Sequence, residues 1–161
     1  MRETVALADL YPLIADVIAG GSSFRLYPRG KGMEPMLCEG RDSVLLGSVD
    51  TIEVGDVLLY RRENGAFVLH RLIERRGGTL TMCGDNQREL EFGITERQVL
   101  AKVVGYYAGE EYRALDSDEY QKYMRERIRR FPFYRRNPKL LAFCTLLGVE
   151  VSFTVTRSPI L

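Results

Sequence analysis

Short apolar runs separated by tight turns fill the middle of this 161-residue chain, and they constrain its fold more than any other feature. The runs are rich in Val, Leu, Ile, Tyr and Phe and are bounded by Gly, Asn and Asp, which is the pattern of β-strands joined by turns. They span residues 24–27, 43–46, 56–60, 67–73, 79–83 and 99–107. Asn64-Gly65 and Gly77-Gly78 each separate two runs, and such residues tolerate the positive φ of a tight hairpin turn. The pattern predicts a mainly β (α+β) fold whose core is a folded antiparallel sheet or barrel.

A helical pattern precedes the predicted sheet. Its apolar residues recur at helical spacing and form one stripe, which consists of Leu10, Leu13, Ile14, Val17 and Ile18. Asp9 is expected to cap this helix, which puts Pro12 in the first turn, where its missing N–H costs little. Gly20-Gly21 is expected to end the helix.

A second helical pattern follows the sheet. Its apolar face consists of Tyr120, Tyr123, Met124, Ile128 and Phe131. Asp116 and Glu119 form a variant of the capping box at its start, and Pro132 is expected to stop it. The sequence therefore divides into a helical leader at residues 1–21, a β core at 22–110 and a basic helical extension at 111–161.

Composition restricts the classes of function. The formal net charge is +1, so no overall field favours a nucleic acid or an acidic partner. The cysteines Cys38, Cys83 and Cys144 are widely spaced and only one histidine is present, so a structural zinc site is not expected. Reduced thiols of this kind are typical of a cytoplasmic protein. Asp9 and Asp16 interrupt the apolar residues near the N-terminus, so we expect neither a signal peptide nor a membrane span there.

Four short segments lie within the strands of the predicted sheet or between them. Residues 30–37 read GKGMEPML, and residues 55–60 read GDVLLY. His70-Arg71 lies inside the fourth predicted strand, and residues 84–87, GDNQ, follow the fifth. Each segment alone is a weak signal, because Gly-Asp pairs are common in turns, but the four in one order are more specific.

In this order, the segments resemble the signature boxes of the type I signal peptidase family and of the related LexA-like self-cleaving repressors. Residues 30–37 are similar to the pattern G-x-S-M-x-P-x-L, and residues 40–42 are similar to a following Gly-Asp with one insertion. Residues 55–60 resemble G-D-V-V-x-[FY], residues 84–87 resemble G-D-N-N, and Gly105 lies where the family ends its closing strand. A histidine before the arginine is typical of the archaeal and endoplasmic-reticulum branch, so the resemblance is to that branch. It covers about half of the chain.

The resemblance implies a signal-peptidase-like serine peptidase domain that acts on an extended peptide. Gly32 occupies the position of the nucleophilic serine, and glycine has no side chain with which to attack a carbonyl. By resemblance, His70 is the general base, Asp85 is the acid that orients it, and the Gly32 backbone N–H is the oxyanion donor. Met33 and Pro35 are then substrate-binding residues, and neither a metal nor a cofactor is implied. The chain is expected to bind a peptide or protein substrate without cleaving it.

Several explanations of Gly32 stay open at this point. The chain is either a natural pseudo-enzyme or one whose serine was replaced. Retention of His70 and Asp85 favours replacement, whereas the usual replacement is alanine, which favours the natural explanation. Cys38 is an alternative nucleophile, although the family has none at that position. The competing class is a peptide-binding or scaffold protein on the same fold that never cleaves.

The C-terminal extension is basic. From Arg125 to Lys139 seven residues are Arg or Lys, and only Glu126 is acidic. Such a run is usually a solvated helix face, with a weak membrane-surface contact as the alternative. Residues 140–156 are mostly apolar but include Glu150, and a membrane span usually needs about twenty apolar residues, so packing against the domain is favoured over a membrane anchor. The single N-terminal helix leaves no room for a helix-turn-helix module, so no sequence-specific nucleic acid is expected as a partner.

Overall fold

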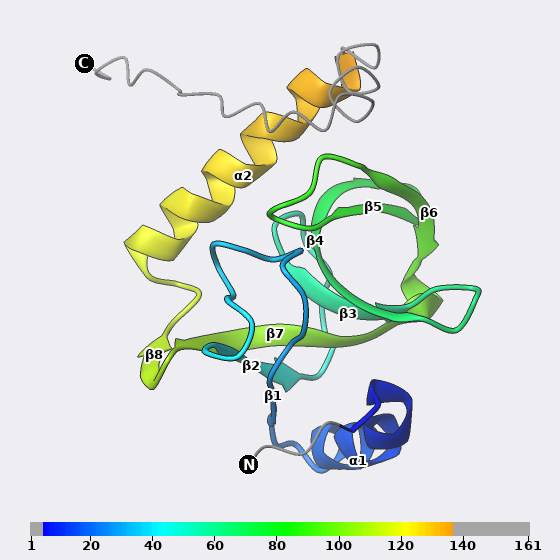
Figure 1. The fold of residues 1–161 in the computed structure, drawn as a ribbon. Helices are drawn as coiled ribbons and strands as arrows, with labels where there is room; N and C mark the ends of the chain where they lie inside the picture. The colour runs from blue at the N-terminus through cyan, green and yellow to red at the C-terminus, as the bar shows by residue number, and fades with distance from the viewer. Residues whose placement is uncertain (1–4, 137–161) are drawn as a thin grey trace.

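The core of the protein is one eight-stranded antiparallel sheet, with a helix before it and a helix after it (Figure 1). The computed structural model describes residues 5–136, and for residues 132–136 it describes the backbone alone. The elements are α1 (Leu7–Ala19), β1 (Phe24–Leu26), β2 (Ser43–Gly47), β3 (Val57–Arg61), β4 (Phe67–Arg76), β5 (Thr79–Cys83), β6 (Glu91–Thr95), a 3₁₀ turn (Glu96–Gln98), β7 (Val99–Ala108), β8 (Glu111–Arg113) and α2 (Asp118–Arg136). The prediction of a mainly β (α+β) fold with an antiparallel sheet and flanking helices is therefore confirmed.

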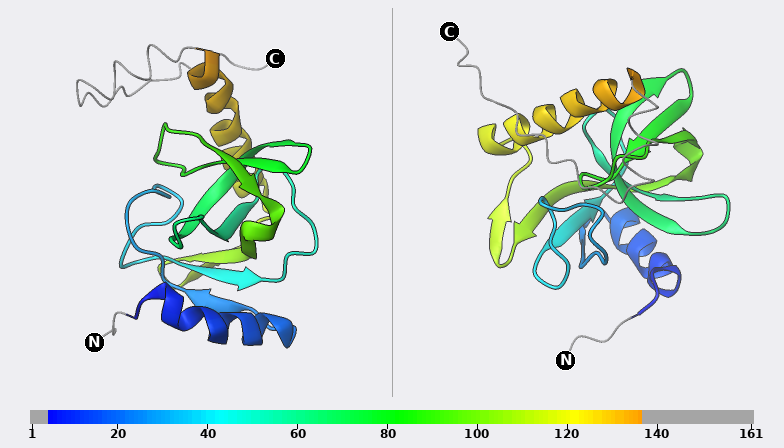
Figure 2. Two further views of the ribbon diagram at one scale, coloured as in Figure 1. Left: turned by 90° about the vertical axis from the view of Figure 1, so that its right-hand side faces the viewer. Right: turned by 45° about the horizontal axis from the view of Figure 1, so that its top comes forward.

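The strands of the sheet follow the order β1-β2-β7-β3-β4-β5-β6, and β8 also pairs with β7. Both predicted hairpins are present, because β3 pairs with β4 across Asn64-Gly65 and β4 pairs with β5 across Gly77-Gly78. The long strand β7 lies between β2 and β3 and so joins the N-terminal strands to the hairpins. Figure 1 and Figure 2 show the sheet folding over, with β4, β5 and β6 curving round together.

β3 is buried on both faces, which explains why its sequence is continuously apolar. Val57 and Leu59 face a core that is shared with α1 and α2. Leu58 and Tyr60 face a second core in the curved part of the sheet. Each fully buried side chain of this size stabilises the fold by roughly 1.5–3 kcal/mol, so β3 is the strand on which both halves of the fold are assembled.

Two strands have no clear signal in the sequence. β6 contains Gly93 at a φ of 77°, and only Ile94 of its five residues is buried. β8 has three residues, follows a turn at Gly109, and extends the sheet beyond residue 110. Backbone pairing with β5 and β7, rather than an alternating apolar pattern, defines these two strands.

The ends of both helices differ from those that the sequence predicts. α1 starts before Asp9, which lies in its first turn rather than at the N-cap, so Pro12 is inside the helix. The start is earlier than predicted because the apolar packing of α1 extends toward its N-terminus. The Ser117 hydroxyl caps α2, by accepting the backbone N–H three residues later at 3.2 Å, in place of the predicted Asp116 cap. The α2 backbone stays helical through Pro132, so the predicted stop there is wrong.

Candidate active site

His70 and Arg71 are neighbours on β4 and point to opposite faces of the sheet. His70 pairs with Leu58 of β3, so its ring lies on the face that also carries Tyr60. Arg71 pairs with Val57, which belongs to the core on the other face. Both side chains are buried, with His70 7% exposed and Arg71 0% exposed. The side chains of His70 and Arg71 therefore lie in different surroundings.

The turn after β5 holds the loop that contains Gly32. The backbone N–H of Asn86 donates to the Gly32 carbonyl at 2.9 Å, and Asn86 Nδ2 donates to the Lys31 carbonyl at 3.1 Å. A Cβ on Gly84 would lie 2.5 Å from the Gly32 carbonyl oxygen. Only glycine permits so close an approach of two backbones. The GDNQ and GKGMEPML segments therefore form one structural unit.

Gly32 and His70 lie next to each other in this unit. A Cβ on Gly32 would lie 3.7 Å from His70 Nε2 and 3.2 Å from Gln87 Nε2. One further bond from that Cβ toward the ring brings a hydroxyl oxygen within hydrogen-bond range of His70 Nε2, about 2.6–3.2 Å. The Gln87 amide is the end of a flexible side chain and can move by the few tenths of an ångström that a Cβ requires. The fold thus brings the predicted nucleophile position and the predicted base together.

Asp85 binds Arg71 instead of the His70 ring. Arg71 Nε and Nη2 donate to the two Asp85 carboxylate oxygens, each at 2.7 Å. The Tyr123 hydroxyl donates to Asp85 Oδ2 at 2.8 Å. The Asp85 carboxylate therefore makes no hydrogen bond to the His70 ring that it is predicted to orient. The reason is the alternation along β4, which puts Arg71 on the side where the turn after β5 places Asp85, and His70 on the other.

The His70 ring has a different partner at its other nitrogen. Its Nδ1 lies 3.2 Å from the Tyr60 hydroxyl, which donates to Glu91 Oε2 at 2.6 Å. Arg62 Nε and Nη2 donate to the two Glu91 oxygens at 2.7 and 2.8 Å. Glu91 and Arg62 could not be identified from the sequence, because neither lies in one of the four segments. For Tyr60 the one available signal is its place at the end of the GDVLLY segment.

Helix α2 contributes polar groups to the buried ion pair between Arg71 and Asp85. Arg71 Nη1 donates to the Tyr120 hydroxyl at 3.0 Å. Arg127 Nη1 donates to the Asp85 backbone carbonyl at 3.3 Å. Together with the Tyr123 hydroxyl, these contacts tie α2 both to the strand of the base and to the turn that holds Gly32. The helix is therefore a structural part of the site.

The remaining candidate residues lie in other surroundings. Met33 is 5% exposed and packs in the core shared with the helices. Its apolar side chain turns inward from the loop, and its substrate-binding role stays a prediction. Pro35 is exposed, and its substrate-binding role stays a prediction. Cys38 is a half-buried free thiol whose backbone N–H donates to Asp42 Oδ2 at 2.8 Å, and its role as an alternative nucleophile also stays a prediction.

Burial controls the charge of the His70 ring. It lowers the pKa of His70 to about 4; the nearby Glu91 and Asp85 carboxylates oppose this shift, and Arg62 adds to it. The ring is therefore uncharged at neutral pH and able to accept a proton. Hydrogen bonds from Arg62 lower the pKa of Glu91, so that residue is a carboxylate. Burial raises the pKa of the Cys83 thiol to about 12, which makes it inert as a nucleophile at neutral pH.

The free energy of unfolding should fall as the pH drops from about 7 to about 5. The histidine has a pKa of about 6.5 in the unfolded chain and about 4 in the folded protein. In this window the unfolded chain therefore binds a proton that the folded protein does not. The expected loss is about 2 kcal/mol by about pH 5, and it ends near pH 4, below which both states are protonated.

Urea unfolding of the native protein and of His70→Gln at the two pH values measures this loss. His70 is the only histidine of the chain, and ordinary carboxylates titrate below this window. His70→Gln should therefore show a nearly flat profile. The same slope in both proteins would contradict a buried, neutral ring.

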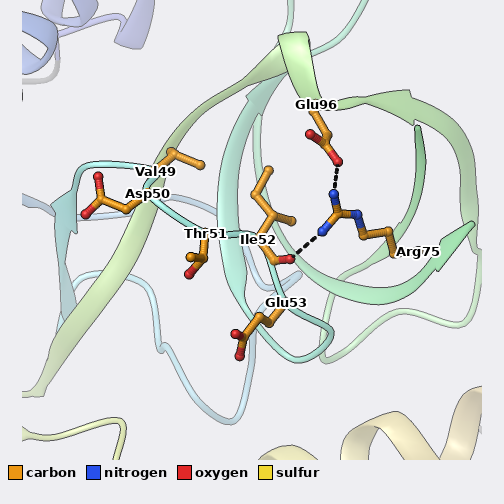
Figure 3. Close-up of a pocket in the computed structure, with 7 residues that line it drawn as sticks. All are labelled: Val49, Asp50, Thr51, Ile52, Glu53, Arg75 and Glu96. Atoms are coloured by element: carbon orange, nitrogen blue, oxygen red, sulfur yellow. Dashed lines mark hydrogen bonds and ion pairs between the residues drawn. The ribbon is translucent and has the colours of Figure 1, made fainter. Parts of the chain in front are cut away.

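None of the candidate site residues lines the surface pocket that Figure 3 shows. It has a volume of about 450 Å³ and is lined by Val49, Asp50, Thr51, Ile52, Glu53, Arg75 and Glu96. Arg75 donates to the Ile52 carbonyl at 3.0 Å and forms an ion pair with Glu96, so the one cation of the pocket is already bound. Within residues 5–136, no group of three or more His, Cys, Asp or Glu side chains is placed so that it could hold a metal ion.

The arginines of the basic run differ in their exposure. Three of its arginines are exposed on α2, namely Arg125, Arg129 and Arg130. Arg127 instead lies over the Tyr123 ring, 4.9 Å from its centre. The part of the run after residue 136 and the apolar segment at 140–156 lie outside the described residues. No helix in the described part of the chain is long and apolar enough to cross a membrane, and a membrane-surface contact stays a prediction.

Comparison with known proteins gives no family for this chain. No protein-family model matches it, and no curated protein matches it. The resemblance to signal peptidases therefore stays a prediction from the sequence. What the structure adds is the closeness of Gly32 to the His70 ring, 3.7 Å from a Cβ placed on Gly32 to Nε2, and the hydrogen bonds that hold each of them.

Proposed function

We propose that this protein is a peptide-binding domain built on a serine-peptidase site of the histidine-base type, with Gly32 at the nucleophile position. The observation that carries the proposal is the distance of 3.7 Å between a Cβ on Gly32 and His70 Nε2. A serine hydroxyl becomes a nucleophile when a base lies within hydrogen-bond reach. Because Gly32 has no hydroxyl, the native protein binds a peptide and releases it uncleaved.

Two further features favour a site of hydrolase type over a scaffold that never cleaves. The His70 ring is buried, so its surroundings fix its orientation, and it is neutral at physiological pH. The turn at Gly84 and Asn86 holds the Gly32 loop by two backbone contacts rather than leaving it loose. A scaffold needs neither feature, whereas both preorganise a catalytic group.

The proposed ligand is an extended segment of a peptide or protein. Extended peptides commonly bind by main-chain hydrogen bonds to a strand or loop edge, and Gly32 is half-buried in a loop. We place the protein in the cytoplasm. Cys38 and Cys83, the two cysteines among the described residues, are both free thiols, in keeping with that location.

Peptide binding by the native protein tests this proposal. Short random-sequence peptides selected on the native protein should shift the NMR signals of the Gly32 amide and the His70 ring, because the proposed site lies between them. Gly32→Val should weaken binding by about tenfold or more, or roughly 1.4 kcal/mol, because a branched side chain fills the space in front of His70 Nε2. Gly78→Ala is the matched control, since a Cβ there meets nothing within 4 Å. Failure to select any peptide, or shifts confined to other surfaces, would contradict the proposal.

A further inference from the structure

The hydrogen bonds behind the His70 ring determine which nitrogen carries its proton. The Tyr60 hydroxyl has one proton, and it donates this proton to Glu91 Oε2 at 2.6 Å. The hydroxyl oxygen can then only accept from His70 Nδ1, which lies 3.2 Å away. Nδ1 is therefore the protonated nitrogen of the neutral ring, and Nε2 carries the lone pair.

The charge of Glu91 fixes the direction of this hydrogen-bond chain. Arg62 binds both Glu91 oxygens, at 2.7 and 2.8 Å, and its hydrogen bonds lower the Glu91 pKa. A carboxylate only accepts hydrogen bonds, so it cannot donate to the Tyr60 hydroxyl and reverse the chain. Tyr60 itself is fully buried, so water does not compete for its hydroxyl.

We infer that Tyr60 and Glu91 are positioning residues for His70, which hold the ring with its Nε2 lone pair toward Gly32. They take the orienting role that the sequence assigns to Asp85. The other charged groups near the ring are Arg62, bound to Glu91, and the Asp85 carboxylate, bound to Arg71. The inference rests on the proposed function only for the use of the lone pair as a base.

The same hydrogen bonds persist when the His70 ring gains a proton. When Nε2 accepts a proton, the ring becomes an imidazolium whose Nδ1–H still donates to Tyr60. The negative charge of Glu91 then favours the imidazolium, and the positive charge of Arg62 opposes it. The proton stays on Nε2 and no proton moves to Glu91, because its pairing with Arg62 keeps Glu91 ionised.

Nitrogen NMR of the ring tests the inference in the native protein, without any need for activity. His70 is the only histidine, so its two ring nitrogens can be assigned without ambiguity. At neutral pH the native ring should show a protonated Nδ1 and an unprotonated Nε2. Tyr60→Phe removes the acceptor and should shift the ring toward the other tautomer. Glu91→Gln removes the negative charge and should lower the His70 pKa further.

Tyr123→Phe is the matched control, because it removes a tyrosine hydroxyl that binds the other carboxylate, Asp85. It should leave the tautomer unchanged. A native ring protonated on Nε2 would overturn the inference, as would a tautomer that responds to Tyr123→Phe and not to Tyr60→Phe. If Tyr60→Phe does not fold, Glu91→Gln decides alone, and an unchanged His70 pKa in that variant would overturn the inference.

A second measurement uses the Gly32→Ser chain and separates the two proposals. In that chain Tyr60→Phe should lower kcat by roughly 10²-fold or more with little change in KM, because a base with its proton on the wrong nitrogen contributes no catalysis. An equal loss from Tyr123→Phe would count against the positioning role. If Gly32→Ser is inactive while the ring tautomer responds as expected, the proposed function fails and the positioning role stands.

Discussion

Asp85→Ala should lower the free energy of unfolding by about 3–5 kcal/mol, because it leaves the Arg71 guanidinium buried without a counter-ion. Both side chains of the pair are 0% exposed. Burial opposes the charge of Arg71, but the hydrogen bonds that Arg71 donates to Asp85 outweigh it and raise the pKa of Arg71, so the guanidinium stays charged. The substitution also removes the acceptor of the Tyr123 hydroxyl and so weakens the attachment of α2. Urea unfolding followed by circular dichroism measures the loss.

The matched control is Glu111→Ala, which removes a carboxylate from an exposed ion pair. Glu111 is 68% exposed and accepts from Arg113 at 2.9 Å. Exposed pairs contribute at most about 1 kcal/mol, so this substitution should change the free energy of unfolding little. If Asp85→Ala costs no more than Glu111→Ala, then the buried pair does not hold the turn after β5 in place.

The strands with an apolar pattern could be predicted from the sequence, and those without one could not. β3 carries a continuous apolar run from Val57 to Tyr60, and β7 carries an apolar run that only Lys102 interrupts, because both strands are central in the sheet. β6 is an edge strand with one buried side chain, so nothing in its composition distinguishes it from a loop. The predicted helix boundaries are wrong for a related reason. A cap or a proline is a local signal of limited size. Tertiary packing overrides it at Asp9, and the α2 backbone stays helical through Pro132.

The site could be predicted from the sequence only in part. The resemblance implies that Gly32 and His70 meet, and in the structure the turn after β5 holds the Gly32 loop beside the His70 ring. The partner of the histidine could not be deduced, since it depends on the face to which each strand residue points. Either His70 or Arg71 could bind the Asp85 carboxylate. Only the pairing of β4 with β3 and β5 shows which of the two side chains faces Asp85, and it is Arg71. Glu91 lies on the strand that the sequence does not reveal.

Gly32→Ser should give the protein a peptidase activity that the native chain lacks, toward added peptides or toward itself. The new hydroxyl lies one bond beyond a Cβ that is 3.7 Å from His70 Nε2, and the ring is neutral and ready to take its proton. The rate should exceed that of the native chain by at least about 10²-fold, the lower end of what a positioned general base contributes. It should rise as the pH rises through about 4, the pKa of His70, and then stay level toward neutral pH.

Two variants make this result specific. Gly32→Ser combined with His70→Gln should return the rate to that of the native chain, because the hydroxyl then has no base. Gly78→Ser places the same side chain in a hairpin turn where a Cβ meets nothing within 4 Å, and it should give no activity. Amide NMR spectra of all variants confirm that each is folded.

The central claim is that Gly32 is the empty nucleophile position of a site whose base is His70. Mass spectrometry of a random peptide library, incubated with Gly32→Ser and with Gly32→Ser combined with His70→Gln, tests it most directly. New cleavage products, from the library or from the protein itself, should appear with Gly32→Ser alone. A folded Gly32→Ser protein that leaves both the library and itself intact, or that cleaves equally well without His70, would contradict it.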